Sequence, residues 1–345
     1  MRSRRKFLVL PVLILSGLTA AACSSSGSSS SSSPAAAGTS AAASAGAVDL
    51  SSVTLNVGDQ KGTGAEALLE AAGMLKDLPF KVNWTDFTSG PPILEAEAAG
   101  SVDVGGVGDV PPVFAASGNE AVVIVGARQV PGGDQDAIVV PKGSSITSLS
   151  QLKGKKIAYG SGSSGNYMLL TALSKATLTT KQVDLVNLQP AEALAAFTSG
   201  AVDAWAIWPP YVQQVVAQDG AKVIAVGADY GTPYDFEVAS KAAVANPQKA
   251  AAIQDYLTVL DKAYVWAEAH PDSWGADWAT AAGLPTSVTD VAAKVDGTTP
   301  ITITSTLTSA LQTMTTNLYK AGLIPSDVNM SGYVTTKFNS SVSGS

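Results

Sequence analysis

The sequence predicts an α/β protein of two lobes, with mostly parallel sheets and a helical C-terminal region. Three observations predict it. Short runs rich in β-branched residues alternate with helix-like stretches over residues 53–207, which is the pattern of βαβ units. A helix–glycine–strand segment recurs at an offset of 100 residues, and strand-like runs give way to helical stretches after about residue 236.

The predicted elements follow one another along the chain. Strands are expected at 53–57, 81–87, 102–107, 121–125, 136–140, 156–159, 183–188 and 202–207. Helices are expected between them at 64–78, 91–99, 167–176 and 190–199, and then at 247–268, 274–282, 287–294 and 305–321.

The recurring segment indicates two lobes of similar construction. Gly100-Ser101-Val102-Asp103 returns as Gly200-Ala201-Val202-Asp203, and each copy follows an Ala/Glu-rich helix and precedes a Pro-Pro pair. Because ligands of open α/β sheets sit at the carboxyl ends of strands, both strand exits should face one cleft. We place lobe 1 at 49–139 and 235–345, with the helical tail packing back on it, and lobe 2 at 140–234.

The N-terminus is typical of an exported protein. Basic residues from Arg2 to Lys6 precede an apolar stretch over Phe7–Ala22, so residues 1–22 are expected to be a signal peptide. The stretch is short for a membrane span. Ser3–Leu8 fits a twin-arginine pattern, which would mean export in the folded state, and ordinary Sec export is the alternative.

The segment after the signal peptide indicates a lipid anchor. Ala20-Ala21-Ala22-Cys23 resembles a bacterial lipobox, and Cys23 is the only cysteine of the chain. We expect lipidation of Cys23, with cleavage by the ordinary signal peptidase as the alternative. Residues 24–48 are almost entirely Ser, Ala and Gly and are expected to form a disordered tether.

Composition excludes several classes of function. The formal net charge is −7, and removing the four basic residues of the signal peptide gives −7 − 4 = −11, which argues against a nucleic-acid partner. One cysteine excludes an internal disulfide and a cysteine-rich metal site, and the single histidine, His270, leaves little room for a hydrolase triad. We expect no enzyme activity, no metal and no cofactor.

Small polar turns at strand ends are candidate anion sites. Gly162, Ser163 and Ser164 follow a predicted strand and open a helix, where backbone N–H groups can bind an anion. Ser89 and Gly90 repeat the arrangement in the first lobe. A Ser/Gly turn with a serine N-cap is the alternative interpretation.

Other polar and aromatic side chains are placed near the same cleft. Gln60 and Asp109 follow predicted strands. Trp205 and Trp208 end a strand on opposite faces, so at least one is expected in the cleft. Arg128, the only arginine after the signal segment, could pair with an anion or lie on the surface.

Together these motifs resemble the aliphatic-sulfonate-binding proteins of ABC importers. The likeness runs over residues 53–325, and its matching segments are Gly58–Gly62, Gly90–Ala96, Gly108–Pro112, Leu152–Gly154, Gly162–Ser164 and Trp205–Tyr211. Two residues depart from the family pattern, because Asp59 replaces a tyrosine and Pro209 replaces an aspartate. Both lie near the expected cleft, which leaves the exact ligand open.

The resemblance implies a type II periplasmic-binding-protein fold that closes over its ligand by hinge motion. It implies capture of a small sulfonate for sulfur acquisition, with an ABC permease and ATPase as partners. The sulfonate would sit on Gly90, Asp109 and Gly162–Ser164, and its tail against Trp205, Trp208 or Tyr211. We expect a monomer, anchored by lipid to the outer face of the cytoplasmic membrane.

Other functions stay open. The same class of protein could bind taurine, a sulfate ester, nitrate or a thiamine-precursor pyrimidine. An enzyme on the same fold, or a sensor that binds no transported solute, is a further alternative.

Overall fold

The computed structural model describes residues 48–60, 64–130, 132–133, 135–295 and 297–342. The predictions for the signal peptide, Cys23 and nearly all of the tether concern residues 1–47 and lie outside the described residues. Within the described part of the chain, no helix combines the length and apolar character needed to cross a bilayer.

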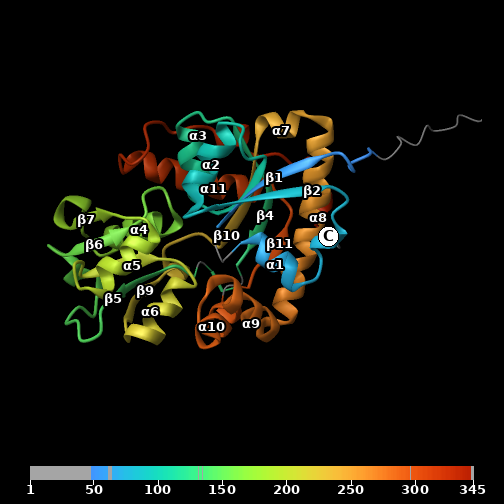
Figure 1. The fold of residues 1–345 in the computed structure, drawn as a ribbon. Coiled ribbons are helices and arrows are strands. Elements are labelled where there is room, and N and C mark those ends of the chain that lie inside the picture. The colour runs from blue at the N-terminus through green and yellow to red at the C-terminus, as the bar shows by residue number, and fades with distance from the viewer. Residues whose placement is uncertain (1–47, 61–63, 131, 134, 296, 343–345) are drawn as a thin grey trace, which may run out of the picture. The chain divides into compact units, whose positions relative to one another are not determined.

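Two sheets organise the described chain (Figure 1). Sheet A has the order β11-β4-β10-β3-β1-β2, and sheet B the order β7-β6-β8-β5-β9. The strands of sheet A are β1 (Thr54–Gln60), β2 (Lys81–Phe87), β3 (Val104–Gly108), β4 (Val122–Gln129), β10 (Tyr234–Ser240) and β11 (Thr299–Ile301). Those of sheet B are β5 (Ala137–Val140), β6 (Lys156–Tyr159), β7 (Asp184–Asn187), β8 (Ala204–Ile207) and β9 (Lys222–Val226).

The predicted α/β fold is confirmed, and both sheets are mixed, with most strands of each sheet running in one direction. In sheet A, β1 pairs in parallel with β2 and β3, and in sheet B, β6 pairs in parallel with β7 and β8. The next strand of each sheet is antiparallel: β10 beside β3, and β5 beside β8. Both antiparallel strands belong to the segments that carry the chain from one sheet to the other, so each enters its sheet in the reverse direction.

The two sheets also show where the chain passes from one lobe to the other. The chain leaves sheet A after β4 and enters sheet B at β5, so the boundary predicted between residues 139 and 140 falls inside β5. It returns between β9 and β10, so the boundary predicted between residues 234 and 235 falls inside β10.

Helices cover both faces of each sheet. On sheet A, one face packs against α1 (Ala65–Ala71), α8 (Pro247–Ala269), α9 (Pro271–Ala282) and α10 (Thr286–Val295). The other packs against α2 (Gly90–Ala98), α3 (Pro111–Ser117) and α11 (Ser305–Lys320). Sheet B lies between α4 (Ser164–Lys175) on one face and α5 (Pro190–Thr198) with α6 (Tyr211–Asp219) on the other. The short α7 (Lys241–Ala245) precedes α8.

The repeated sequence segment has the same structure in both sheets. Gly100 and Gly200 follow α2 and α5 with φ angles of 79° and 74°, a left-handed conformation that favours glycine. Asp103 donates its N–H to the carbonyl of Asn56 and accepts the N–H of Asn56 on Oδ2, both at 2.8 Å. Asp203 makes the same two bonds with Lys156, also at 2.8 Å. Each aspartate therefore clamps the first residues of its parallel neighbour strand.

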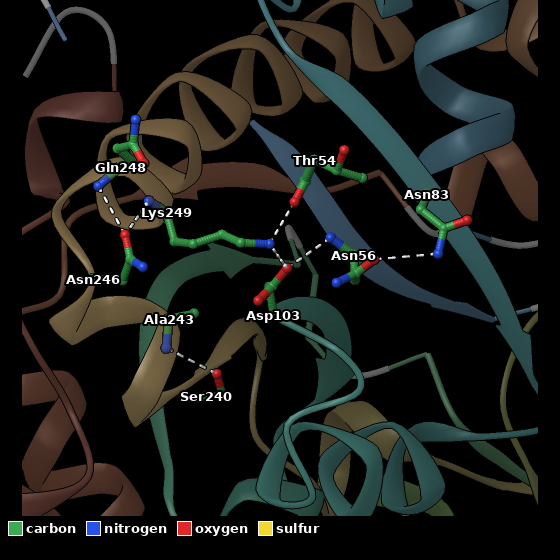
Figure 2. A network of polar contacts seen from close by, with 9 residues as sticks. All are labelled: Thr54, Asn56, Asn83, Asp103, Ser240, Ala243, Asn246, Gln248 and Lys249. Atoms are coloured by element: carbon green, nitrogen blue, oxygen red, sulfur yellow. Dashed lines mark hydrogen bonds and ion pairs between the residues drawn. The ribbon is translucent and has the colours of Figure 1, made fainter. Parts of the chain in front are cut away.

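The clamp in sheet A extends into a polar network (Figure 2). Lys249, from the start of α8, contacts both Asp103 Oδ2 and the carbonyl of Thr54. Asn246 Oδ1 accepts the N–H groups of Gln248 and Lys249 and so caps the same helix. The network therefore fixes the N-terminus of the long helix α8 to the edge of the β1–β3 pair.

The two clamps should differ in strength, because Asp103 also pairs with a lysine. We expect Asp103→Ala to lower the free energy of unfolding by about 3 kcal/mol and Asp203→Ala by about 2 kcal/mol. Urea denaturation followed by circular dichroism measures both. Asp277→Ala, at an exposed position of α9, is the control and should change stability little. A loss at Asp203 no larger than at the control would contradict this role.

Candidate functional site

A cavity of about 170 Å³ lies where the carboxyl ends of strands from both sheets meet. Residues at the ends of β1 and β3 line it from sheet A, and the N-terminus of α4 and the exit of β8 line it from sheet B. Its volume is below the roughly 300–1,000 Å³ of drug-sized ligand pockets, which suits a small ligand.

The cavity brings together most of the residues that the sequence singled out. Those lining it are Gln60, Gly90, Asp109, Arg128, Ser163, Ser164 and Trp208. They come from both sheets, as the expectation of one cleft between two lobes required.

Trp205 and Tyr211 lie elsewhere, which corrects their expected place. Trp205 is fully buried, and its ring centroid is 5.9 Å from that of Phe197 and 5.7 Å from that of Tyr211. Strand alternation turns Trp205 to the face covered by α5 and α6, and Tyr211 packs on the same face. Trp208, beyond the end of the strand, is the tryptophan of this motif that reaches the cavity.

Ser89 and Gly162 also lie outside the cavity lining, for different reasons. The hydroxyl groups of Thr88 and Ser89 donate to Gln189 Oε1 at 2.8 and 3.1 Å, so they join the start of α2 to the start of α5. The N–H of Gly162 donates to Asn166 Oδ1 at 3.1 Å, which uses the amide that was expected to bind a ligand.

The serines at the start of α4 have separate tasks. Ser163 Oγ accepts the N–H of Asn166 at 3.2 Å and donates to the carbonyl of Gly160 at 2.7 Å, so it caps the helix. Ser164 faces sheet A instead, since a Cβ on Gly108 would lie 3.5 Å from Ser164 Oγ. The Ser164 hydroxyl therefore stands between the two sheets at the cavity wall.

Asp59 is buried and organises the start of α1. Its Oδ1 accepts the N–H groups of Gln60 and Ala65, and its Oδ2 that of Glu66, all at 2.9 Å. Burial raises the pKa of Asp59 to about 6, against the lowering effect of these three bonds. The residue that departs from the family pattern is thus a helix-capping group of the cavity wall.

Arg128 is neutralised within the fold. Its guanidinium NH1 lies 2.6 Å from Glu237 Oε1, and its carbon Cζ lies 4.3 Å from the ring centroid of Tyr264. Burial raises the pKa of Glu237 to about 7, and Arg128 opposes that rise. Arg128 is therefore neither a surface residue nor an isolated positive charge.

The cavity lining is acidic. Among the described residues that line it, Arg128 is the only basic side chain, and the acidic ones are Asp59, Asp109, Asp136, Asp235, Glu237 and Glu268, which gives +1 − 6 = −5. Asp109 Oδ2 accepts a hydrogen bond from the hydroxyl of Thr232 at 2.6 Å. Asp235 Oδ1 lies 3.8 Å from where a Cβ on Gly108 would stand, close to Ser164.

Sequence reasoning missed the far side of the cavity. Tyr264, Trp274 and Trp278 line it from α8 and α9, and Thr298 lines it just before β11. The two tryptophans are one helical turn apart, a spacing that is typical of an ordinary core stripe. Nothing in a single sequence distinguishes that stripe from a cavity wall. Among the described residues, no group of three or more His, Cys, Asp or Glu side chains is placed to hold a metal ion.

Comparisons with known proteins identify the family. Residues 89–274 match the family described as NMT1/THI5 like. An Escherichia coli (strain K12) protein named for binding aliphatic sulfonates is 35% identical over 289 residues, 82% of this chain and 89% of the relative. A taurine-binding periplasmic protein of the same organism is 31% identical over 284 residues, 76% of this chain and 85% of the relative.

A solved structure shares the arrangement of both sheets. The alkanesulfonate-binding protein SsuA from Xanthomonas axonopodis pv. citri, bound to MOPS, superposes with a TM-score of 0.77 at 29% identity. The match covers 83% of this chain and 99% of that chain. With a family match over more than half its length, the chain belongs to the NMT1/THI5-like family, in the group of ABC-importer solute-binding proteins that contains the aliphatic sulfonates-binding proteins.

Proposed function

We propose that this protein captures a small alkanesulfonate outside the cytoplasm and delivers it to an ABC permease and ATPase for sulfur acquisition. One observation carries the proposal: the N-termini of α2 and α4, from different sheets, line one small cavity, and the Ser164 hydroxyl lies at its wall against Gly108 of β3. Helix N-termini and hydroxyl groups bind an anion without a full positive charge. The named relatives of similar length support the same ligand class.

The remaining parts of the proposal rest on the sequence. Lipidation of Cys23 would hold the protein at the outer face of the cytoplasmic membrane, and residues 24–48 would let it reach the permease. We infer that the protein catalyses no reaction, because these relatives are named as binding proteins. We also propose that it works as a monomer.

A zwitterion such as taurine is a second candidate ligand, and Asp235 favours it. The Asp235 carboxylate lies near Ser164, since Asp235 Oδ1 and Ser164 Oγ are both within 3.8 Å of the position that a Cβ on Gly108 would take. The positive charge that acts on it is that of Arg128, which Glu237 already neutralises. An ammonium group next to a sulfonate would therefore find a carboxylate within reach of the same anion site.

Loss of the Ser164 hydroxyl should weaken sulfonate binding. We expect Ser164→Ala to raise the Kd of ethane-1-sulfonate by about tenfold, since a hydrogen bond to a charged group is lost. Isothermal titration calorimetry with sulfonates, sulfate, nitrate and a thiamine-precursor pyrimidine tests the ligand class at the same time. Ser161→Ala, in the same turn but exposed, is the control. Binding of nitrate or a pyrimidine, with no sulfonate bound, would refute the proposal.

Affinity for a simple alkanesulfonate should rise as pH falls from 8 to 5.5. Glu237 and Asp59, with pKa values raised by burial to about 7 and about 6, take up protons in this range and make the cavity less negative. Glu237→Gln should bind more tightly at pH 8 and lose the part of the pH dependence near 7. Calorimetry over this range checks both. A slope of opposite sign in the wild type would contradict the assignment.

The Asp235 carboxylate should decide between two isosteric ligands. If the second candidate is right, taurine binds at least tenfold more tightly than propane-1-sulfonate, in which a methyl group replaces the ammonium. Asp235→Asn should then bring the two Kd values close together. Equal affinities in the wild-type protein would exclude a zwitterion preference and leave the simple alkanesulfonate as the ligand.

A further inference from the structure

We propose that Trp274, Trp278 and Thr298 form a tail subsite for elongated sulfonates that carry a hydrogen-bonding group at their distal end. The inference rests on the proposed sulfonate function and adds the part of the ligand that discriminates among sulfonates. In this proposal the organic tail of the ligand contacts the helices that cover sheet A, and not the tryptophan motif after β8.

The wall of this subsite is apolar and aromatic. Trp274 and Trp278 stack with their ring centroids 5.3 Å apart and an interplanar angle of 13°. Leu68 of α1, Ala267 of α8 and Ala293 of α10 complete the wall, and all of these residues line the same cavity as Ser164. An apolar surface of this kind suits the carbon chain of a ligand.

Thr298 supplies a polar group that the protein leaves unsatisfied. Its side chain lines the cavity, the residue is only 6% exposed, and Oγ1 has no hydrogen-bond partner among the described residues. Buried hydroxyl groups almost always have a partner, because leaving one without it costs free energy. A hydroxyl, ether or amine at the end of a ligand would provide that partner.

The distance between the anion site at Ser164 and the hydroxyl of Thr298 requires a ligand longer than a two-carbon sulfonate. Ser164 lies against Gly108 at the end of β3, whereas Thr298 directly precedes β11. Strands β10 and β4 lie between β3 and β11, and across them Gly108 is in register with Pro300 of β11. Three strand spacings amount to about 14 Å. A two-carbon sulfonate bound at Ser164 is therefore too short to reach Thr298.

Calorimetry with three ligands tests the subsite in the purified protein: ethane-1-sulfonate, hexane-1-sulfonate and 5-hydroxypentane-1-sulfonate. The last two are isosteric and differ in a terminal methyl or hydroxyl group. We expect hexane-1-sulfonate to bind at least fivefold more tightly than ethane-1-sulfonate, and the hydroxylated ligand at least fivefold more tightly again. Thr298→Val should bring the two long ligands to equal affinity and leave ethane-1-sulfonate unchanged.

Two further variants separate the subsite from general stability. Ala293→Leu fills the space beside the indoles and should remove the advantage of both long ligands without weakening ethane-1-sulfonate. Thr315→Val changes a buried threonine of α11, on the other face of sheet A, and should leave all three affinities unchanged.

The outcomes distinguish this inference from the proposed function. Ethane-1-sulfonate binding with no gain for the longer ligands, or a hydroxyl preference that survives Thr298→Val, overturns the tail subsite alone. Failure of every sulfonate to bind overturns the proposed function and the subsite with it.

Discussion

The architecture depends on one interaction made twice, the aspartate clamp that joins neighbouring parallel strands. Asp103 and Asp203 each exchange a pair of hydrogen bonds with the first residues of β1 and β6, at equal distances. Parallel strands have no hairpin to set their register, so a side chain that bonds the backbone of its neighbour is an effective alternative. Once β1 and β6 are fixed, the ends of β1 and β3 and the exit of β8 lie at one cavity, together with the N-termini of α1, α3 and α4.

Much of this arrangement could be predicted because it is local and repeated. The strands at 81–87 and 156–159 have the bounds that their residues indicated, and both clamps lie in the Gly-X-Val-Asp segments whose recurrence indicated two similar lobes. The antiparallel strand β10 was missed because its buried face carries Asp235 and Glu237, so no simple apolar alternation marks it. Charges in a central strand make sense only when Arg128, distant in sequence, is known to lie beside them.

The same distinction applies to the candidate site, where local features could be predicted and contacts between distant residues could not. Polar turns at strand ends were recognisable, since position in a βα unit determines where they go. The hydrogen-bonding partners of the side chains, and the directions in which the side chains point, could not be predicted. Asn166 accepts the N–H of Gly162, Glu237 neutralises Arg128, and Trp205 is fully buried while Trp208 is only partly buried and reaches the cavity. Each of these outcomes depends on which side chain, distant in sequence or on a neighbouring turn, lies next to the group, which a single sequence does not record.

The contact between Gln189 and the hydroxyl groups of Thr88 and Ser89 has a kinetic consequence. One amide oxygen at the start of α5 accepts from both side chains at the start of α2, without touching the cavity itself. Separation of the two sheets must break these bonds whether or not a solute is bound. They therefore contribute to the barrier for release rather than to recognition, and the residence time of any ligand would be set partly by residues that never meet it.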